Sequence, residues 1–246
     1  MIPRLTIAIF SFQMLCLAFT QQTDRSILTE RNLVDGSFIK DYTNKWKVTY
    51  VANDGKETPN KVWTDYGQII ELNGKIYFHR IQDLYDPKMN LQETWINMVE
   101  YPSLRPVSFS RTTPTGQFTF IQFDGNKVNS ISNFQSESLT PSGTNVELVE
   151  SAYDWNLYGM LLVALPFEEG LTSKLPFYST QTGALDWLIT TVEGQESLVL
   201  SNEEIVTTWK LSTNQNLTFW LTKSAPYVHR LELELQNNAK LIWETL

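Results

Sequence analysis

Residues 154–166 read Asp-Trp-Asn-Leu-Tyr-Gly-Met-Leu-Leu-Val-Ala-Leu-Pro, and they interrupt a chain that otherwise follows strand patterns. Four large apolar residues recur there at helical spacing: Trp155, Tyr158, Leu162 and Leu165. Asp154 can accept hydrogen bonds from the free N–H groups of a first helical turn, and Pro166 ends the helical pattern. Met160 and Leu161 widen the apolar face. We therefore predict a short, buried helix over Asp154–Ala164.

Strand patterns lie on both sides of this helix. In Lys45–Val51, the residues Trp46, Val48 and Tyr50 alternate with lysine and threonine, which is typical of a half-buried strand. Asn73-Gly74 predicts a hairpin turn. Other strands are expected in several ranges: Gln68–Leu72, Lys75–Gln82, Leu91–Val99, Val107–Arg111, Gln117–Phe123, Lys127–Asn133, Leu171–Ser179, Ala184–Glu193, Glu204–Ser212, Leu217–Lys223, Tyr227–Gln236 and Lys240–Thr245. A flat sheet would leave one apolar face in water, so we predict a mainly β fold in which about twelve strands form a curved antiparallel sheet around one central helix.

The composition excludes two broad classes of protein. The 246 residues include 31 aromatic ones and are 42% hydrophobic, which is incompatible with intrinsic disorder. The formal net charge of −8 argues against a nucleic-acid binder that is held by bulk charge.

The N-terminus predicts export. Residues 1–20 have the pattern of a signal peptide, with Arg4 before an apolar run and small residues that favour cleavage after Thr20. An uncleaved anchor and a lipoprotein modified at Cys16 are the alternatives. Cleavage removes the only cysteine, which excludes a disulfide scaffold, and no later stretch is long and apolar enough to span a membrane. The localisation expected is therefore the periplasm or cell envelope.

We expect residues 21–246 to form a single antiparallel β domain. A repeated spacing, from Trp95 to Arg105 and from Trp220 to Arg230, makes two β halves flanking helix 154–164 an alternative.

From Ser151 onward the sequence resembles a family of exported bacterial proteins of unknown function, DUF3108. The segments that carry the resemblance are the helix from Tyr153 to Gly170, Val192-Glu193-Gly194-Gln195-Glu196, Val206–Lys210, and Phe219–Lys223 followed by Pro226–Glu232. The first half matches through Trp95, Leu104-Arg105-Pro106 and Phe123-Asp124-Gly125. The resemblance implies a LolA-like or LolB-like open half-barrel and an envelope location. LolA and LolB carry acyl chains of lipoproteins in their concave face.

A search for catalytic chemistry finds none. The two histidines, His79 and His229, lack a zinc-binding spacing, and no nucleophile elbow or phosphate-binding loop occurs. The carboxylate pair Glu232 and Glu234 shares its strand face with Arg230 and reads as a solvated face. We therefore expect no catalytic residue, no metal ligand, no cofactor and no enzymatic activity.

The aromatic residues are the unusual feature. Five of them are candidates for an apolar ligand-binding groove: Trp155, Trp187, Trp209, Trp220 and Tyr227. The alternative is that these rings fill the space between sheet and helix. The function expected is an exported binding or carrier protein for a lipid, an acylated protein or another apolar ligand. An envelope scaffold that binds a protein partner, or less favourably an exported hydrolase, is the alternative.

Overall fold

A computed structural model of the protein describes residues 33–134, 142–180 and 182–246. The predicted signal peptide lies outside these residues. The strands are β1 (Tyr42–Val51), β2 (Glu57–Leu72), β3 (Lys75–Tyr85), β4 (Leu91–Glu100), β5 (Pro106–Thr112), β6 (Phe118–Asp124), β7 (Lys127–Ser132), β8 (Ser142–Glu147), β9 (Tyr153–Asp154), β10 (Thr172–Ser179), β11 (Ala184–Val199), β12 (Ile205–Thr213), β13 (Leu217–Leu221), β14 (Val228–Glu234) and β15 (Lys240–Thr245). The helices are the 3-10 helix η1 (Trp155–Leu157), α1 (Tyr158–Val163) and the 3-10 turn η2 (Gln236–Asn238).

All the strands of the described residues belong to one 15-stranded sheet. Its order is β8-β7-β6-β5-β4-β3-β2-β1-β15-β14-β13-β12-β11-β10-β9. Neighbouring strands are antiparallel, except that β9 runs parallel to β10. The first strand, β1, pairs with the last, β15, and so joins two meanders that the chain builds separately. These features confirm the predicted mainly β fold with one large, curved antiparallel sheet.

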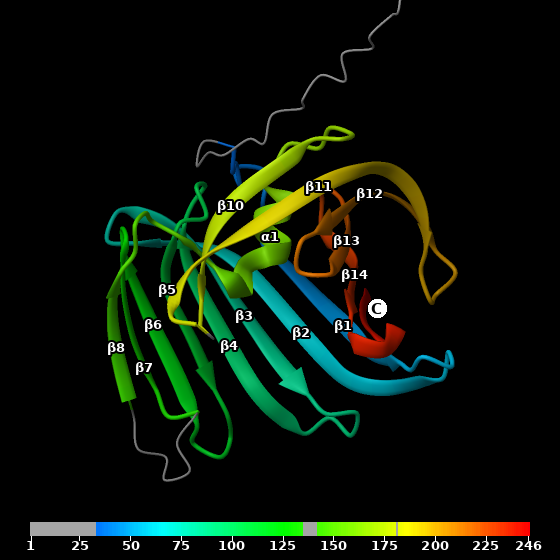
Figure 1. The fold of residues 1–246 in the computed structure, drawn as a ribbon, viewed down its shortest axis with the longest axis horizontal. Coiled ribbons are helices and arrows are strands. Elements are labelled where there is room, and N and C mark those ends of the chain that lie inside the picture. Colours follow the sequence, from blue (N-terminus) through cyan, green and yellow to red (C-terminus); the bar gives the residue numbers. More distant parts are fainter. Residues whose placement is uncertain (1–32, 135–141, 181) are drawn as a thin grey trace, which may run out of the picture.

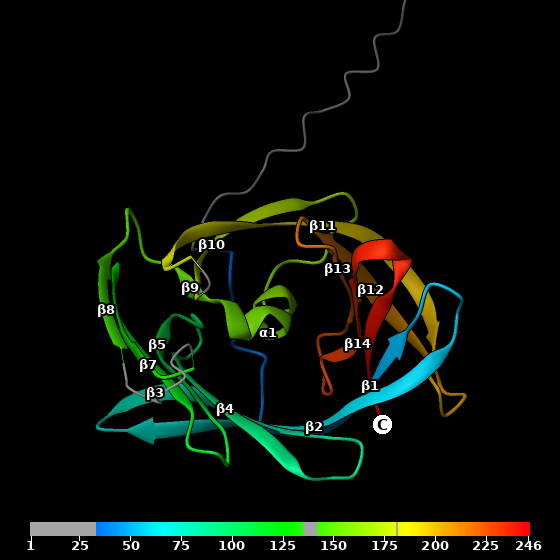
Figure 2. The same cartoon turned by 60° about the horizontal axis from the view of Figure 1, so that its bottom comes forward.

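The sheet curves around α1, which lies inside its concave side (Figure 1). In the turned view, β2 and β4 pass below the helix while β10 and β11 pass above it (Figure 2). β8 and β9 are the two edges, so the described sheet does not close. An open sheet of this curvature places inward-facing residues from many strands around one short helix.

The predicted helix and its cap are confirmed. The Asp154 carboxylate accepts a hydrogen bond from the Asn156 N–H at 3.0 Å, and the chain then passes through η1 into α1. Five of the six residues of α1 are buried, with Gly159 between them. At the other end, the Lys223 ammonium donates hydrogen bonds to the carbonyls of Val163 and Leu165. Those carbonyls would otherwise be unsatisfied at the helix C-terminus.

Several local predictions were wrong. The prediction missed β8, β9 and the first half of β2, and it therefore counted too few strands. The pairing of β1 with β2 shifts register between Val48 and Thr49, which turns Thr49 inward and leaves Tyr50 exposed. The equal spacing from Trp95 to Arg105 and from Trp220 to Arg230 also does not correspond to equivalent positions in the sheet. Trp95 lies opposite Arg111, whereas Trp220 lies opposite Arg230.

In the ranges that the structure describes, we find no helix with the length and apolar character needed to cross a membrane.

Candidate functional site

Four tryptophans from separate strands face the concave side of the sheet. Trp95, Trp63, Trp46 and Trp243 lie on β4, β2, β1 and β15, within one run of adjacent strands that also contains β3. Trp46 and Trp63 are directly opposite each other in the β1–β2 ladder. The Trp63 ring centroid lies 5.5 Å from that of Trp95 and 5.9 Å from that of Trp243, in edge-to-face arrangements. We call these four residues the tryptophan row.

The tryptophan row forms one wall of a cleft with a volume of about 300 Å³. The helical segment provides the opposite wall through Trp155, Asn156, Tyr158 and Gly159. The other lining residues are Arg80, Gln82, Gln215, Leu217, Phe219, Val228, Leu231 and Leu233. The volume lies at the lower end of the range for small-molecule sites, and an aromatic lining with a few polar groups is typical of such sites.

A buried ion pair lies behind this cleft. Arg80 contacts Asp65 through two hydrogen bonds, from Nε at 2.9 Å and from Nη2 at 2.7 Å. Its Nη1 donates to the Asn156 carbonyl at 3.3 Å, which ties β3 to the start of the helical segment. The Tyr42 hydroxyl also donates to Asp65, at 3.3 Å. Arg80 thus presents its edge to the cleft while Asp65 neutralises its charge from behind.

A second buried carboxylate, Asp154, anchors the helical wall. It is 2% exposed, and it accepts hydrogen bonds from the Asn97 amide at 2.5 Å and from the Asn156 backbone and side chain at 3.0 Å each. Burial raises the pKa of Asp154 to about 6, against the lowering effects of these bonds and of Arg80. Neither Asp154 nor Asp65 lines the cleft.

Several donors around the cleft have no hydrogen-bond partner among the described residues. They are the indole N–H groups of Trp46, Trp63 and Trp243 and the hydroxyl of Tyr158. Burial raises the pKa of the Tyr158 phenol, so this hydroxyl remains a neutral donor. Buried indole and phenol groups usually find partners, because leaving one unmade costs about 1–3 kcal/mol. The concentration of such groups in one place distinguishes the cleft from ordinary core.

The structure brings one of the five predicted groove residues, Trp155, to the cleft. The other four lie elsewhere. The Lys174 ammonium lies 4.0 Å from the Trp187 ring, and the Trp209 ring packs 5.7 Å from that of Phe167. Trp220 and Tyr227 are buried. Trp220 donates a hydrogen bond to Glu196, and the Tyr227 ring lies edge-to-face with that of Tyr42, with 5.5 Å between the centroids.

The histidines and carboxylate pairs also lie outside the cleft. His229 lines a separate polar pocket, and its Nε2 lies 3.1 Å from the Thr222 hydroxyl. Glu232 forms ion pairs with Arg230 and Lys240. No group of three or more His, Cys, Asp or Glu side chains suited to a metal ion occurs in the described parts of the chain.

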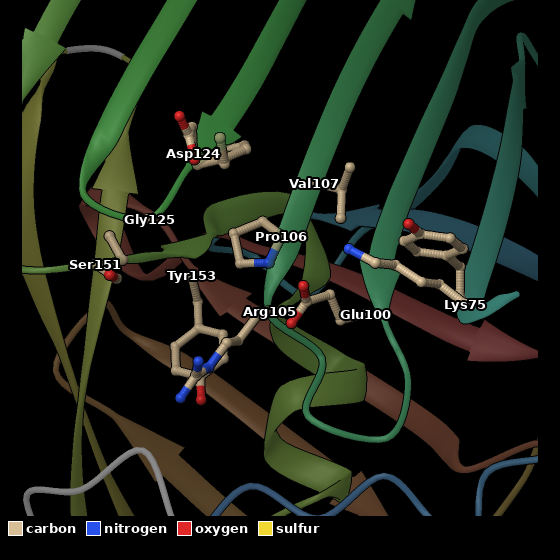
Figure 3. Close-up of a pocket in the computed structure, with 12 residues that line it drawn as sticks. Lys75, Glu100, Arg105, Pro106, Val107, Asp124, Gly125, Ser151 and Tyr153 are labelled. Atoms are coloured by element: carbon tan, nitrogen blue, oxygen red, sulfur yellow. The ribbon is translucent and has the colours of Figure 1, made fainter. Parts of the chain in front are cut away.

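A second hollow, of about 280 Å³, lies at the ends of β3 to β6 (Figure 3). Four charged side chains line it, two of each sign: Lys75, Arg105, Glu100 and Asp124. All four are exposed, so water solvates them. Balanced, solvated charges give this hollow no preference for one class of ligand.

A family model matches residues 80–242, which is well over half of the chain. The chain belongs to the DUF3108 family. The description of DUF3108 is a protein of unknown function, so membership assigns no chemistry. No curated protein and no solved structure matches the chain. The DUF3108 match includes Trp95 and Trp155, whereas Trp46 and Trp63 precede it and Trp243 follows it directly. The cleft is therefore the feature of the molecule that bears on function.

Proposed function

We propose that this DUF3108 protein is a non-enzymatic binding protein of the carrier type, which holds a small, largely apolar ligand in the tryptophan-lined cleft. The observation that carries the proposal is the joint presence of an aromatic cleft and unpaired buried donors in the same walls. Aromatic walls bind apolar groups through buried area, and a few polar groups fix the orientation of the ligand.

Core filling alone accounts less well for these residues. Tryptophans that only fill a core bring their N–H groups to acceptors or are replaced by apolar side chains without that requirement. Here three indoles from three strands leave their N–H groups unpaired beside the same cleft. The N–H groups are themselves buried, so a ligand would contact the rings, and its apolar part would account for their gathering around one cleft.

The proposal also includes export to the periplasm or cell envelope and a LolA-like half-barrel. The signal-peptide pattern of residues 1–20 supports the first. The curved sheet around a single short helix supports the second.

The neutral apolar dye N-phenylnaphthylamine tests the proposal, because its fluorescence rises when it leaves water. We expect saturable binding to the wild-type protein. Trp63→Leu removes the ring that contacts both Trp95 and Trp243, and we expect it to weaken binding by about tenfold, as loss of one large buried contact does. Leu233→Trp would fill part of the cleft with a larger side chain, so we expect it to weaken dye binding as well.

Trp187→Leu is the matched control, because Trp187 does not line the cleft, and we expect its binding to equal that of the wild type. Circular dichroism of each variant checks that it is folded. Dye binding that is unaffected by both Trp63→Leu and Leu233→Trp would contradict the proposal.

A further inference from the structure

Gln82 places an unused amide in the cleft. The residue is 3% exposed and lines the cleft from β3, directly opposite Asp65 on β2 and Trp95 on β4. Its side chain has no hydrogen-bond partner among the residues that the structure describes. An amide can both donate and accept, so a ligand group at this point can be hydrogen-bonded without carrying a charge.

Arg80 lies two residues before Gln82 and faces the same side of β3. A guanidinium has five N–H groups, and Arg80 uses three of them on Asp65 and Asn156. The remaining N–H groups favour an acceptor atom in the cleft. A cationic ligand group beside them is disfavoured by like charge.

An anionic group is not favoured either. The charge of Arg80 is already matched by the bidentate contact with Asp65, and neither Asp65 nor Asp154 lines the cleft. Arg80 is the only charged residue among those that line the cleft in the described chain. An ion of either sign would thus lose its hydration in the cleft and find no unmatched opposite charge among the lining residues.

The polar and apolar parts of the cleft come from different elements. Arg80 and Gln82 on β3, with Asn156 on η1, form a polar patch between the strands of Trp95 and Trp63, and Gln215, before β13, is a separate polar lining residue. From there the wall continues across β2, β1, β15 and β14 as tryptophan and leucine side chains: Trp63, Trp46, Trp243, Leu231 and Leu233. A ligand that matches this order has a polar head and an apolar tail.

We propose that the cleft selects an uncharged amphiphile, whose ester or hydroxyl oxygens bind Gln82 and Arg80 and whose hydrocarbon tail lies along the tryptophan row. This inference rests on the proposed binding function and adds the chemical class of the ligand. A monoacylglycerol is the simplest compound with this chemistry.

Isothermal titration with three amphiphiles of equal chain length tests the inference. Monodecanoylglycerol is uncharged, decanoate is anionic and decyltrimethylammonium is cationic; each is used below the concentration at which it aggregates, at pH 7.5. We expect monodecanoylglycerol to bind about tenfold more tightly than either ion, the factor that one well-placed hydrogen bond provides.

Gln82→Met keeps the size of the side chain and removes its amide. We expect this variant to lose about tenfold in affinity for monodecanoylglycerol. Gln122→Met, on the exposed face of β6, is the control and should bind as the wild type does.

The outcomes separate the two proposals. Equal or tighter binding of decanoate or of decyltrimethylammonium overturns the inference about the head group while leaving a binding function in place. Unchanged affinity of Gln82→Met for monodecanoylglycerol overturns the role of Gln82. If none of the three amphiphiles nor the dye binds, the proposed function itself is wrong.

Discussion

Replacing Asp154 by asparagine isolates the energetic effect of a buried carboxylate. Its folded-state pKa of about 6 lies above the ordinary value of 3.8. Below pH 3.8 the Asp154 carboxyl is protonated in both the folded and the unfolded state. Between about pH 4 and 6 the unfolded state releases this proton while the folded state keeps it. The free energy of unfolding therefore falls as the pH rises through this range. At about 1.4 kcal/mol per pKa unit, the loss amounts to about 3 kcal/mol and is complete above pH 6.

Asparagine preserves the local structure at this position. It is as good an N-cap as aspartate, so the hydrogen bond from the Asn156 N–H remains available. The amide nitrogen of the new asparagine would face the side-chain nitrogen of Asn97. The side-chain oxygen of Asn97, Oδ1, is buried without a hydrogen-bond partner. Rotating the Asn97 amide by half a turn therefore restores the bond. We expect Asp154→Asn to be more stable than the wild type at pH 7 and similar to it at pH 4.

Urea unfolding followed by tryptophan fluorescence at pH 4, 5, 6 and 7 measures this effect. The free energy of unfolding of the wild type minus that of Asp154→Asn should decrease by about 3 kcal/mol between the lowest and highest pH. Taking this difference cancels the carboxylates with lowered pKa values, such as Glu93 and Glu193, which act in the opposite direction in both proteins. Asp124→Asn, at an exposed position, is the control. Parallel profiles for wild type and Asp154→Asn would refute the reasoning.

Two further substitutions test the close packing at Gly67 and the buried ion pair of Arg80 and Asp65. A Cβ atom at Gly67 would lie 2.3 Å from Tyr42 Cε1 and 2.8 Å from Phe78 Cε2, both on buried rings, so Gly67→Ala should destabilise the protein by about 3 kcal/mol in thermal unfolding. Gly143→Ala, where the nearest atom is 3.3 Å away, should have a much smaller effect, and equal effects would contradict the steric argument. Arg80→Met leaves the buried Asp65 carboxylate with the Tyr42 hydroxyl but without its cation, and should cost about 3–5 kcal/mol. The double variant Arg80→Met/Asp65→Leu should recover part of that loss. A double variant that is less stable than Arg80→Met would show that the penalty does not come from the unpaired carboxylate.

The elements that the sequence predicted are those with local signals. Asn73 and Gly74 both have positive φ, as the hairpin between β2 and β3 requires, and their dipeptide is recognisable in the sequence. The helical segment was recognisable because apolar spacing, a capping aspartate and a closing proline occur together. Each of these signals acts within a few residues.

The elements that were missed have no clear apolar alternation of their own and depend on pairing with a neighbouring strand. β8 reads Ser-Gly-Thr-Asn-Val-Glu and has no useful alternation, so its extended form comes from its pairing with β7. The first half of β2 contains Pro59 and mostly exposed residues, which conceal a strand that pairs with β1 beyond the core. Simple alternation placed Tyr50 on the same face as Trp46 and Val48, but the register shift between Val48 and Thr49 leaves Tyr50 exposed.

The cleft was missed because nothing local identifies it. Trp46, Trp63, Trp95 and Trp243 are spread over most of the chain, and only the strand order brings them together. Proximity along the sequence instead drew attention to Trp187, Trp209 and Trp220, which the fold directs elsewhere. Gln82 showed no signal at all, because a glutamine in an alternating strand normally faces water.

The ladder between β1 and β15 is a seam, the line along which the first and last strands of the described residues pair. Trp46 stands on one side of that seam and Trp243 on the other, so the binding wall straddles it. Removal of β15 would therefore take Trp243 from the cleft and leave β1 and β14 without their common neighbour. The cleft is therefore complete only when the two meanders have joined, so an intact cleft reports that the whole sheet has formed.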